Sequence, residues 1–222
     1  MTFQSNINQK ELKKGNIFDL FKTPNIRKNS LCMMYQWFTC SFCFYGVCQY
    51  ISHLTGNIFL NVAISATVVT IGSFLSIPLL QLMKRKPMLI IFQAISSGCF
   101  FVLAITPWAI ARTIIASLGV VCSFIVFILV YLYGSELFPT VVRSAGIGVS
   151  SMSARVGSMI APFVLDTAGI HKILPPLIFA IVPFFSAFIA LLMPETKDRE
   201  LMTTIQEGED FKSLPNKTPI KE

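Results

Sequence analysis

Six long apolar stretches, separated by short polar segments, make up most of this sequence. Each holds roughly 20–25 residues, and a helix of that length crosses a hydrocarbon core of about 30 Å. The predicted membrane spans are Leu31–Ile51, Asn57–Met83, Pro87–Pro107, Arg112–Tyr133, Val141–Asp166 and Ile173–Met193. Because the connections are short, successive helices should be antiparallel neighbours. The pattern therefore predicts an all-α polytopic membrane protein with six transmembrane helices, flanked by polar segments at residues 1–30 and 194–222.

Basic residues are concentrated in alternate connections of this predicted bundle. Six precede the first span, three lie between the second and third spans, Arg143 lies at the start of the fifth, and five follow the sixth. The other connections hold only Arg112 and Lys172. Since positively charged segments stay on the cytoplasmic side, this alternation predicts that both terminal segments are cytoplasmic.

Composition excludes several classes of protein. Hydrophobic residues make up 54% of the chain and charged residues 13%, too apolar for a soluble enzyme, a nucleic-acid-binding protein or a disordered chain. The six cysteines lie within apolar stretches and the two histidines form no cluster, so we expect packing cysteines and no metal site. No phosphate-binding loop or nucleophile–base arrangement stands out, so we expect neither enzymatic activity nor a cofactor.

One charge, Arg155, lies at the centre of the fifth apolar stretch. An arginine at mid-bilayer costs about 2.5–3.5 kcal/mol on insertion scales, so it should not face lipid. A stripe of small residues suited to close helix packing runs along the same helix, at Gly146, Ser150, Ser153 and Gly157. Arg155 follows Gly146 by about two and a half turns and points away from that stripe. We expect its guanidinium to face a water-filled cavity; the alternative is a structural arginine bonded to helix carbonyls.

Aromatic residues on the first and fourth stretches are candidates for a cavity wall. Phe124, Phe127 and Tyr131 share one helical face, a pattern that more often indicates core or lipid contact than one side of a cavity. Tyr35 and Trp37 of the first stretch are explained by anchoring at the membrane interface.

Five motifs, in this order and at this spacing, resemble the C-terminal half of a major facilitator transporter of the organic anion and organic cation transporter family. They are IFDLFKTPNIRKNSL (17–31), WFTCSFCFYG (37–46), YGSELFPTVVR (133–143), SMSARVGSMIAPF (151–163) and LMPETK (192–197). The resemblance covers nearly everything from about Gly15 to Gly208. It implies one six-helix half of a major facilitator bundle, with substrate bound at mid-membrane depth between two halves.

The resemblance also implies a substrate site. In that family, members favouring anions tend to carry Arg where this chain has Arg155, and members favouring cations tend to carry an acidic residue. The physical reason is that a guanidinium attracts carboxylate and sulfate groups and repels ammonium groups. The aromatic positions of the family's cavity correspond to Phe44, Tyr45, Phe127 and Tyr131. We therefore expect small organic ions as substrates, with anions favoured.

A set of charges is implied to form the cytoplasmic gate. The superfamily's loop motif D-x-x-G-R-R corresponds here to QLMKRK (81–86), which keeps two basic positions but loses the acid and the glycine. With Gln81 in place of the acid, we expect a weakened gate, and we favour a gate role for Glu136 with Arg143. The alternative is that these are solvated charges, each worth under ~1 kcal/mol. The gate residues implied by the resemblance are Arg85, Lys86, Glu136, Arg143 and Glu195.

Together these features predict membrane transport of small organic ions by facilitated diffusion or exchange, without bond chemistry. The expected protein is integral to the membrane, in the plasma membrane, and has no nucleic-acid partner. Its expected partners are lipid, the substrate, and an N-terminal transporter half or another chain. The alternative function is a truncated, non-transporting membrane protein that pairs with or regulates a full-length relative.

Overall fold

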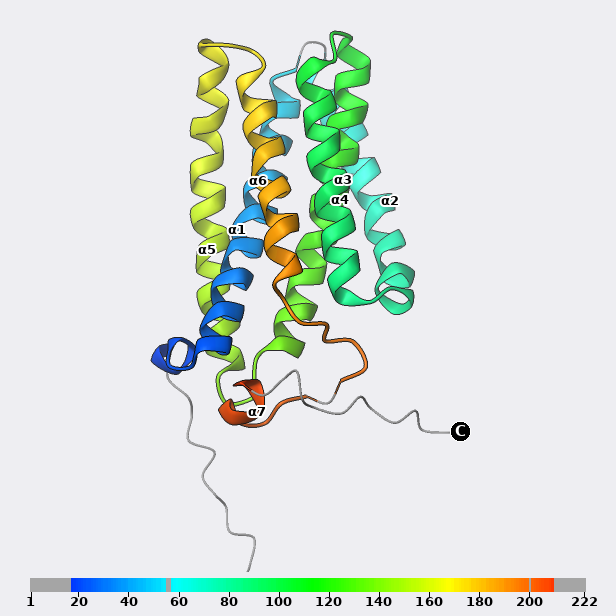
Figure 1. Ribbon diagram of the computed structural model, residues 1–222. Coiled ribbons are helices and arrows are strands. Elements are labelled where there is room, and N and C mark those ends of the chain that lie inside the picture. The colour runs from blue at the N-terminus through cyan, green and yellow to red at the C-terminus, as the bar shows by residue number, and fades with distance from the viewer. Residues whose placement is uncertain (1–16, 55–56, 200, 210–222) are drawn as a thin grey trace, which may run out of the picture.

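Long antiparallel helices make up the protein (Figure 1). The computed structural model describes residues 17–54, 57–199 and 201–209. The short elements are the 3-10 segments η1 (Ile17–Phe21) and η2 (Thr167–Gly169) and the helix α7 (Ile205–Glu209). The long helices are α1 (Pro24–Ser52), α2 (Ile58–Leu82), α3 (Arg85–Ile105), α4 (Ala109–Leu137), α5 (Arg143–Asp166) and α6 (Leu174–Leu191). The prediction of an all-α chain is confirmed.

Five of the long helices, α2 to α6, are long and apolar enough to cross a membrane. Helix α1 has 29 residues, a length of about 43 Å, but it is less apolar and falls outside that group. Its polar residues fit its position, because α1 contacts α2, α4, α5 and α6 and buries Gln36, Thr39 and Ser41 within the bundle. The predicted six-span bundle is therefore close to what is found: five helices qualify by length and composition, and α1 runs among them.

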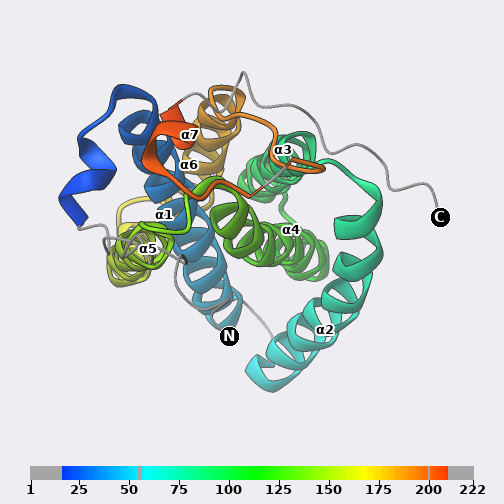
Figure 2. The same ribbon diagram turned by 90° about the horizontal axis from the view of Figure 1, so that it is seen from below.

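The helices are arranged around a central pair, as Figure 2 shows in the view along the bundle. Helices α1 and α4 pack against each other at the centre, and α3 and α6 pack together on one side of them. Helices α2 and α5 lie at the two flanks, α2 against α4 and α5 against α1. These flanking helices are the least buried of the five candidate spans, with 17% of the most apolar segment buried in α2 and 28% in α5. Opposite the α3–α6 layer, α1 and α4 therefore present a face bordered by two sparsely covered helices.

Small residues let α5 approach α1 closely. A Cβ atom added at Gly157 would lie 2.6 Å from the backbone oxygen of Phe38, so no larger residue fits without moving α1. Gly146 is also buried, but its close neighbour is the ring of Phe138 at the end of α4, 2.8 Å from where a Cβ atom would lie. Ser150 of the stripe is also buried, whereas Ser153 is half-buried and its neighbour Ala154 is buried. Three of the four residues of the predicted small-residue stripe are therefore buried, and Ala154 is buried in place of Ser153.

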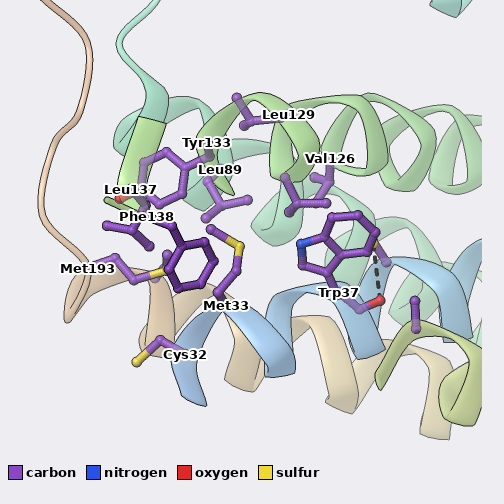
Figure 3. Packing of buried hydrophobic residues seen from close by; sticks show 14 of the residues in the cluster. Cys32, Met33, Trp37, Leu89, Val126, Leu129, Tyr133, Leu137, Phe138 and Met193 are labelled. Atoms are coloured by element: carbon purple, nitrogen blue, oxygen red, sulfur yellow. Dashed lines mark hydrogen bonds between the residues drawn. The ribbon is translucent and has the colours of Figure 1, made fainter. Parts of the chain in front are cut away.

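A hydrophobic core joins α1 to α3 and α4. Figure 3 shows Met33 of α1 near Leu89 of α3, and the Trp37 ring near Val126 of α4. These four side chains are at most 1% exposed. This packing fixes the position of the α1 face that carries the candidate site.

Buried polar side chains also connect α1, α3 and α6. Gln36 Nε2 donates a hydrogen bond to the backbone oxygen of Ser186 at 2.8 Å, and Ser186 Oγ donates to Gln36 Oε1 at 2.6 Å. Gln93 Nε2 donates to Gln36 Oε1 and to Ser186 Oγ, both at 3.1 Å. Because a polar group within the membrane must find its partner inside the protein, this network favours one arrangement of the three helices.

The segment after α6 crosses the end of the bundle where α1 begins, which we call the tail end. There the Glu209 carboxylate accepts hydrogen bonds from the backbone nitrogens of Asn25 at 3.1 Å and Ile26 at 3.4 Å. Asn25 Nδ2 donates to the backbone oxygen of Glu209 at 3.0 Å. Glu209 thus satisfies first-turn N–H groups of α1 that have no partner within the helix. The predicted terminal segments are described only in part, because residues 1–16 and 210–222 lie outside the described residues.

Candidate functional site

A pocket of about 390 Å³ lies between α1, α4 and α5. It is lined by Trp37, Ser41, Tyr45 and Gln49 of α1, Phe127 and Tyr131 of α4, and Ser151, Ala154, Arg155 and Ser158 of α5. Four of the five residues predicted for substrate binding therefore border one cavity. The fifth, Phe44, is not part of the lining.

Arg155 lies at the middle of α5. It is twelve residues from the start of a 24-residue helix, about 18 Å along its axis. The residue is exposed in the single chain, and within the described ranges no acidic side chain is paired with its guanidinium. The described residues also show no hydrogen bond from its side chain to a helix carbonyl. Its charge is therefore available to a ligand in the pocket.

Aromatic rings form one wall of the pocket. The rings of Trp37 and Tyr131 meet edge to face, with centroids 4.2 Å apart, and those of Phe127 and Tyr131 are 5.4 Å apart. Phe44 lies beside this wall, with its ring centroid 5.2 Å from Tyr45 and 6.4 Å from Phe127. Phe44 thus supports rings that line the pocket and does not line it directly.

Trp37 is a pocket residue that the sequence-based interpretation missed. Interfacial anchoring is wrong for this side chain, because it is 1% exposed and belongs to the core. Its indole Nε1 is buried and has no hydrogen-bond partner among the described residues. The signal was present in the sequence as a four-residue repeat, because Trp37, Ser41, Tyr45 and Gln49 occupy one face of a helix.

A second group of predicted residues lies at the tail end. Arg85 of α3 and Glu136 of α4 form an ion pair, with Arg85 Nη2 3.2 Å from Glu136 Oε1. The two side chains are 12% and 18% exposed, so water screens the pair less than it would at an open surface. Thr196 Oγ1 donates to Glu136 Oε2 at 2.6 Å. The pair therefore connects α3, α4 and the segment that follows α6.

Glu195 binds the first turn of α3. Its two carboxylate oxygens accept hydrogen bonds from the backbone nitrogens of Arg85 at 2.9 Å and Lys86 at 3.2 Å. A carboxylate at this position also interacts favourably with the helix dipole. The Lys86 side chain points elsewhere, because its Nζ donates to the backbone oxygen of Leu191 at 2.7 Å. Lys86 thus joins this cluster through its backbone.

Arg143 lies near Glu136 but is not its ion-pair partner among the described residues. Its Nε donates to the backbone oxygen of Phe138 at 3.3 Å, and its Nη2 is buried without a partner in the described part of the chain. Arg143 and Glu136 both line a pocket of about 360 Å³. All five predicted gate residues therefore gather at one end of the bundle, and the ion pair there joins Glu136 to Arg85.

The pocket that contains Arg155 has side chains suited to binding a ligand. Its polar groups are one guanidinium, one amide and several hydroxyls, and the rest of its lining is aromatic or small. Across the described residues, no group of three or more His, Cys, Asp or Glu side chains could hold a metal ion. The fold and the pocket together define a polytopic helical membrane protein with a solute-sized cavity at mid-depth.

The family follows from comparison with known proteins. The sequence matches the family described as "Sugar (and other) transporter" over residues 2–207, which is most of the chain. The chain belongs to this family of membrane transporters. The resemblance inferred from its motifs is confirmed.

Similar proteins include transporters named for anions and for cations. Organic anion transporter 3 of Sus scrofa is 32% identical over 224 residues, covering 100% of this chain and 41% of the relative. Organic cation transporter 1 of Caenorhabditis elegans is 33% identical over 218 residues, covering 96% and 37%. Solute carrier family 22 member 6 of Rattus norvegicus is 33% identical over 205 residues, covering 90% and 37%. The chain thus spans about two fifths of the length of these relatives.

Proposed function

We propose that this chain is the C-terminal six-helix half of a secondary transporter in the plasma membrane, which moves small organic ions by facilitated diffusion or exchange and favours anions. The observation that most directly supports this proposal is the arrangement of four residues around one pocket at mid-depth: Arg155, Tyr45, Phe127 and Tyr131. Residues 31–193 form the half-bundle, between cytoplasmic segments at 1–30 and 194–222.

The pocket suits a flat ion with one negative group. The Arg155 guanidinium offers parallel N–H donors that match the two oxygens of a carboxylate or the oxygens of a sulfate. The ring wall contributes dispersion and edge-to-face contacts without requiring one pattern of hydrogen bonds, which suits a range of aromatic solutes. Serine hydroxyls and Gln49 remain for secondary polar contacts.

The flanking helices support a partner half. Large apolar side chains on the sparsely covered faces of α2 and α5 are more than half exposed, among them Phe74, Leu75, Met159 and Phe163. A second six-helix half packed on these faces would cover them and close the pocket from the other side. Transporters of this superfamily bind substrate at such a junction between halves.

The charged cluster at the tail end supports a cytoplasmic gate. Basic residues concentrate at this end, which places it on the cytoplasmic side by the positive-inside rule. Arg85, Glu136 and Glu195 hold α3, α4 and the segment after α6 together there. In this proposal Gln81 lacks the charge that relatives use across the two halves, so the closed state is held less firmly.

The Trp37 side chain provides a direct binding test. We would prepare the chain in nanodiscs with Trp108→Phe, which leaves Trp37 as its tryptophan, and titrate it with benzoate and with benzylammonium while recording fluorescence. Benzoate should quench the fluorescence of Trp37 saturably and benzylammonium should not.

Arg155→Gln should weaken benzoate binding about tenfold, the usual worth of one charge-assisted contact. The matched control is Arg27→Gln, an exposed arginine on the first turn of α1. Equal responses to the two ions would contradict anion preference.

Transport is tested by joining the chain to a second half. Cells expressing this chain together with the N-terminal half of a similar organic anion transporter should accumulate radiolabelled benzoate, and Arg155→Asp should abolish that uptake. If the chain shows no benzoate binding and instead lowers uptake by a co-expressed full-length relative, the regulatory alternative is correct.

A further inference from the structure

A large apolar groove lies on the side of the bundle away from the candidate substrate pocket. It has a volume of about 890 Å³ and runs between α3 and α6. Phe101, Phe184 and Phe188 on its walls are each at least half exposed. Its one polar side chain, Ser97, already donates to the backbone oxygen of Ala180 at 2.8 Å. The groove therefore offers apolar surface and no free polar side chain along its length.

A lysine stands at the tail-end mouth of this groove. Lys86, Ile90 and Ala94 follow each other at four-residue intervals, so they occupy one face of α3, and Ile90 and Ala94 line the groove. Lys86 Nζ is fixed at the mouth by its hydrogen bond to the backbone oxygen of Leu191, a lining residue of α6. Lys84, two residues earlier at the N-cap of α3, is exposed at the same end. The positively charged side chains therefore lie directly at the end of the apolar groove.

The length of the groove matches one leaflet of a bilayer. Val102 lies twelve positions after Ile90 along the α3 lining, a rise of about 18 Å. Half of a ~30 Å hydrocarbon core is about 15 Å. An acyl chain lying in the groove would therefore have its headgroup at Lys86, at the depth where charged lipid groups are found.

We infer that the α3–α6 groove is a binding site for an anionic phospholipid of the tail-end leaflet, with an acyl chain along the groove and its phosphate at Lys86. The proposed orientation makes this the cytoplasmic leaflet, in which anionic lipids attract basic residues at the membrane surface. The lipid covers the outer layer of the bundle and bridges α3 to α6 at the point where Glu195 binds the first turn of α3. This site is separate from the pocket at Arg155 and does not depend on what that pocket binds.

Gly98 allows the groove to be blocked without disturbing the core. A Cβ atom added there meets no other atom within 4 Å, so Gly98→Leu places a side chain in the open groove. Gly148 on α5 also meets nothing within 4 Å and lies away from the groove, so Gly148→Leu is the matched control. Lys86→Gln tests the headgroup contact, and Lys28→Gln, an exposed lysine at the same end, is its control.

The experiment measures retained lipid by native mass spectrometry of the 222-residue chain released from nanodiscs with equal phosphatidylserine and phosphatidylcholine. The chain should retain phosphatidylserine in preference. Lys86→Gln should lower that preference about fivefold, the worth of one lysine at an anionic surface. Gly98→Leu should remove the retained lipid, and both controls should match the parent chain.

Equal retention of the two lipids, or unchanged retention in Gly98→Leu, would overturn the proposal. So would a Gly98→Leu variant that loses a dimer instead of a lipid, because the groove would then be an interface between copies.

Discussion

The guanidinium of Arg85 lies 3.2 Å from the carboxylate of Glu136, which joins the first turn of α3 to the last turns of α4. The Arg85 backbone nitrogen is bound at the same time by Glu195 at 2.9 Å. One residue therefore contacts two carboxylates through different groups, and three segments that are far apart in sequence meet at it.

Breaking this pair should destabilise the tail end of the bundle. Glu136→Gln leaves the partly buried Arg85 charge without its partner and should lower the free energy of unfolding by about 2 kcal/mol. Thermal unfolding in detergent measures the loss. The double variant Arg85→Glu with Glu136→Arg restores opposite charges and should recover part of the lost free energy of unfolding. When Arg85→Gln is already present, adding Glu136→Gln should lower the free energy of unfolding little further. Full additivity of the two single changes would show that the pair contributes no coupling energy.

The close approach of α5 to α1 makes Gly157 sensitive to size. Gly157→Val would drive side-chain atoms into the backbone of Phe38 and should cost about 1–3 kcal/mol through strain. Gly148→Val, at an exposed position of the same helix, is the control for the helix propensity of valine. Cysteine cross-linking would measure the distance between α1 and α5 in each variant, and thermal unfolding would measure the loss of stability. Equal effects at the two positions would show that the contact is not tight.

The ring of Trp37 should contribute to ligand binding, because it lines the pocket. Trp37→Phe keeps a smaller ring in the wall and weakens its edge-to-face contact with Tyr131, and a lost aromatic contact of this kind costs about 1 kcal/mol, or about fivefold in affinity. We expect weaker binding of benzoate, with thermal stability little changed, in equilibrium dialysis of the labelled ligand. Trp108→Phe, on the exposed residue before α4, should leave affinity unchanged. An unchanged affinity in Trp37→Phe would show that the size of this ring does not matter for binding.

Glu207 should make the order of α7 depend on pH. The backbone nitrogen of Thr203 donates to its carboxylate at 2.7 Å and the Thr203 hydroxyl at 3.0 Å, and these bonds hold the pKa of Glu207 below its ordinary value. A lowered pKa means that the stabilisation is complete above the ordinary glutamate pKa and is lost as the pH falls through the folded value. Hydrogen exchange of the Thr203 amide, corrected for its intrinsic rate, should therefore show weaker protection in acid. In Glu207→Gln the protection should be weak at every pH; retained pH dependence there would assign the effect to another group.

Helix positions were predictable wherever membrane thickness determines them. The expected span Asn57–Met83 and the observed α2 (Ile58–Leu82) differ by one residue at each end, because the apolar length of a span is set by the bilayer. Helix α1 begins at Pro24, about two turns before the expected Leu31. Its first turn is polar and is bound by Glu209, a residue 184 positions away, and no local pattern signals such a partner.

The candidate site could be predicted where it depends on a single charge or on the spacing of residues along one helix. Arg155 was recognised because a charge inside an apolar stretch requires an explanation, and the structure places it beside the aromatic residues expected from the resemblance. Trp37 was assigned to the interface because its place in the first span was judged by residue type and not by helical spacing. The ion-pair partner of Glu136 could not be read from the sequence, because it depends on how α3 packs on α4.

The bond between Glu209 and the first turn of α1 has a mechanical consequence. Helix α1 is continuous from that turn to the pocket, and Trp37 and Tyr45 lie about three and six turns further along it. A continuous helix moves as a stiff rod, so a shift at its tether is passed on to the rings it carries. Any modification or binding event that pulls Glu209 away from Asn25 would therefore change the shape of the cavity from a distance.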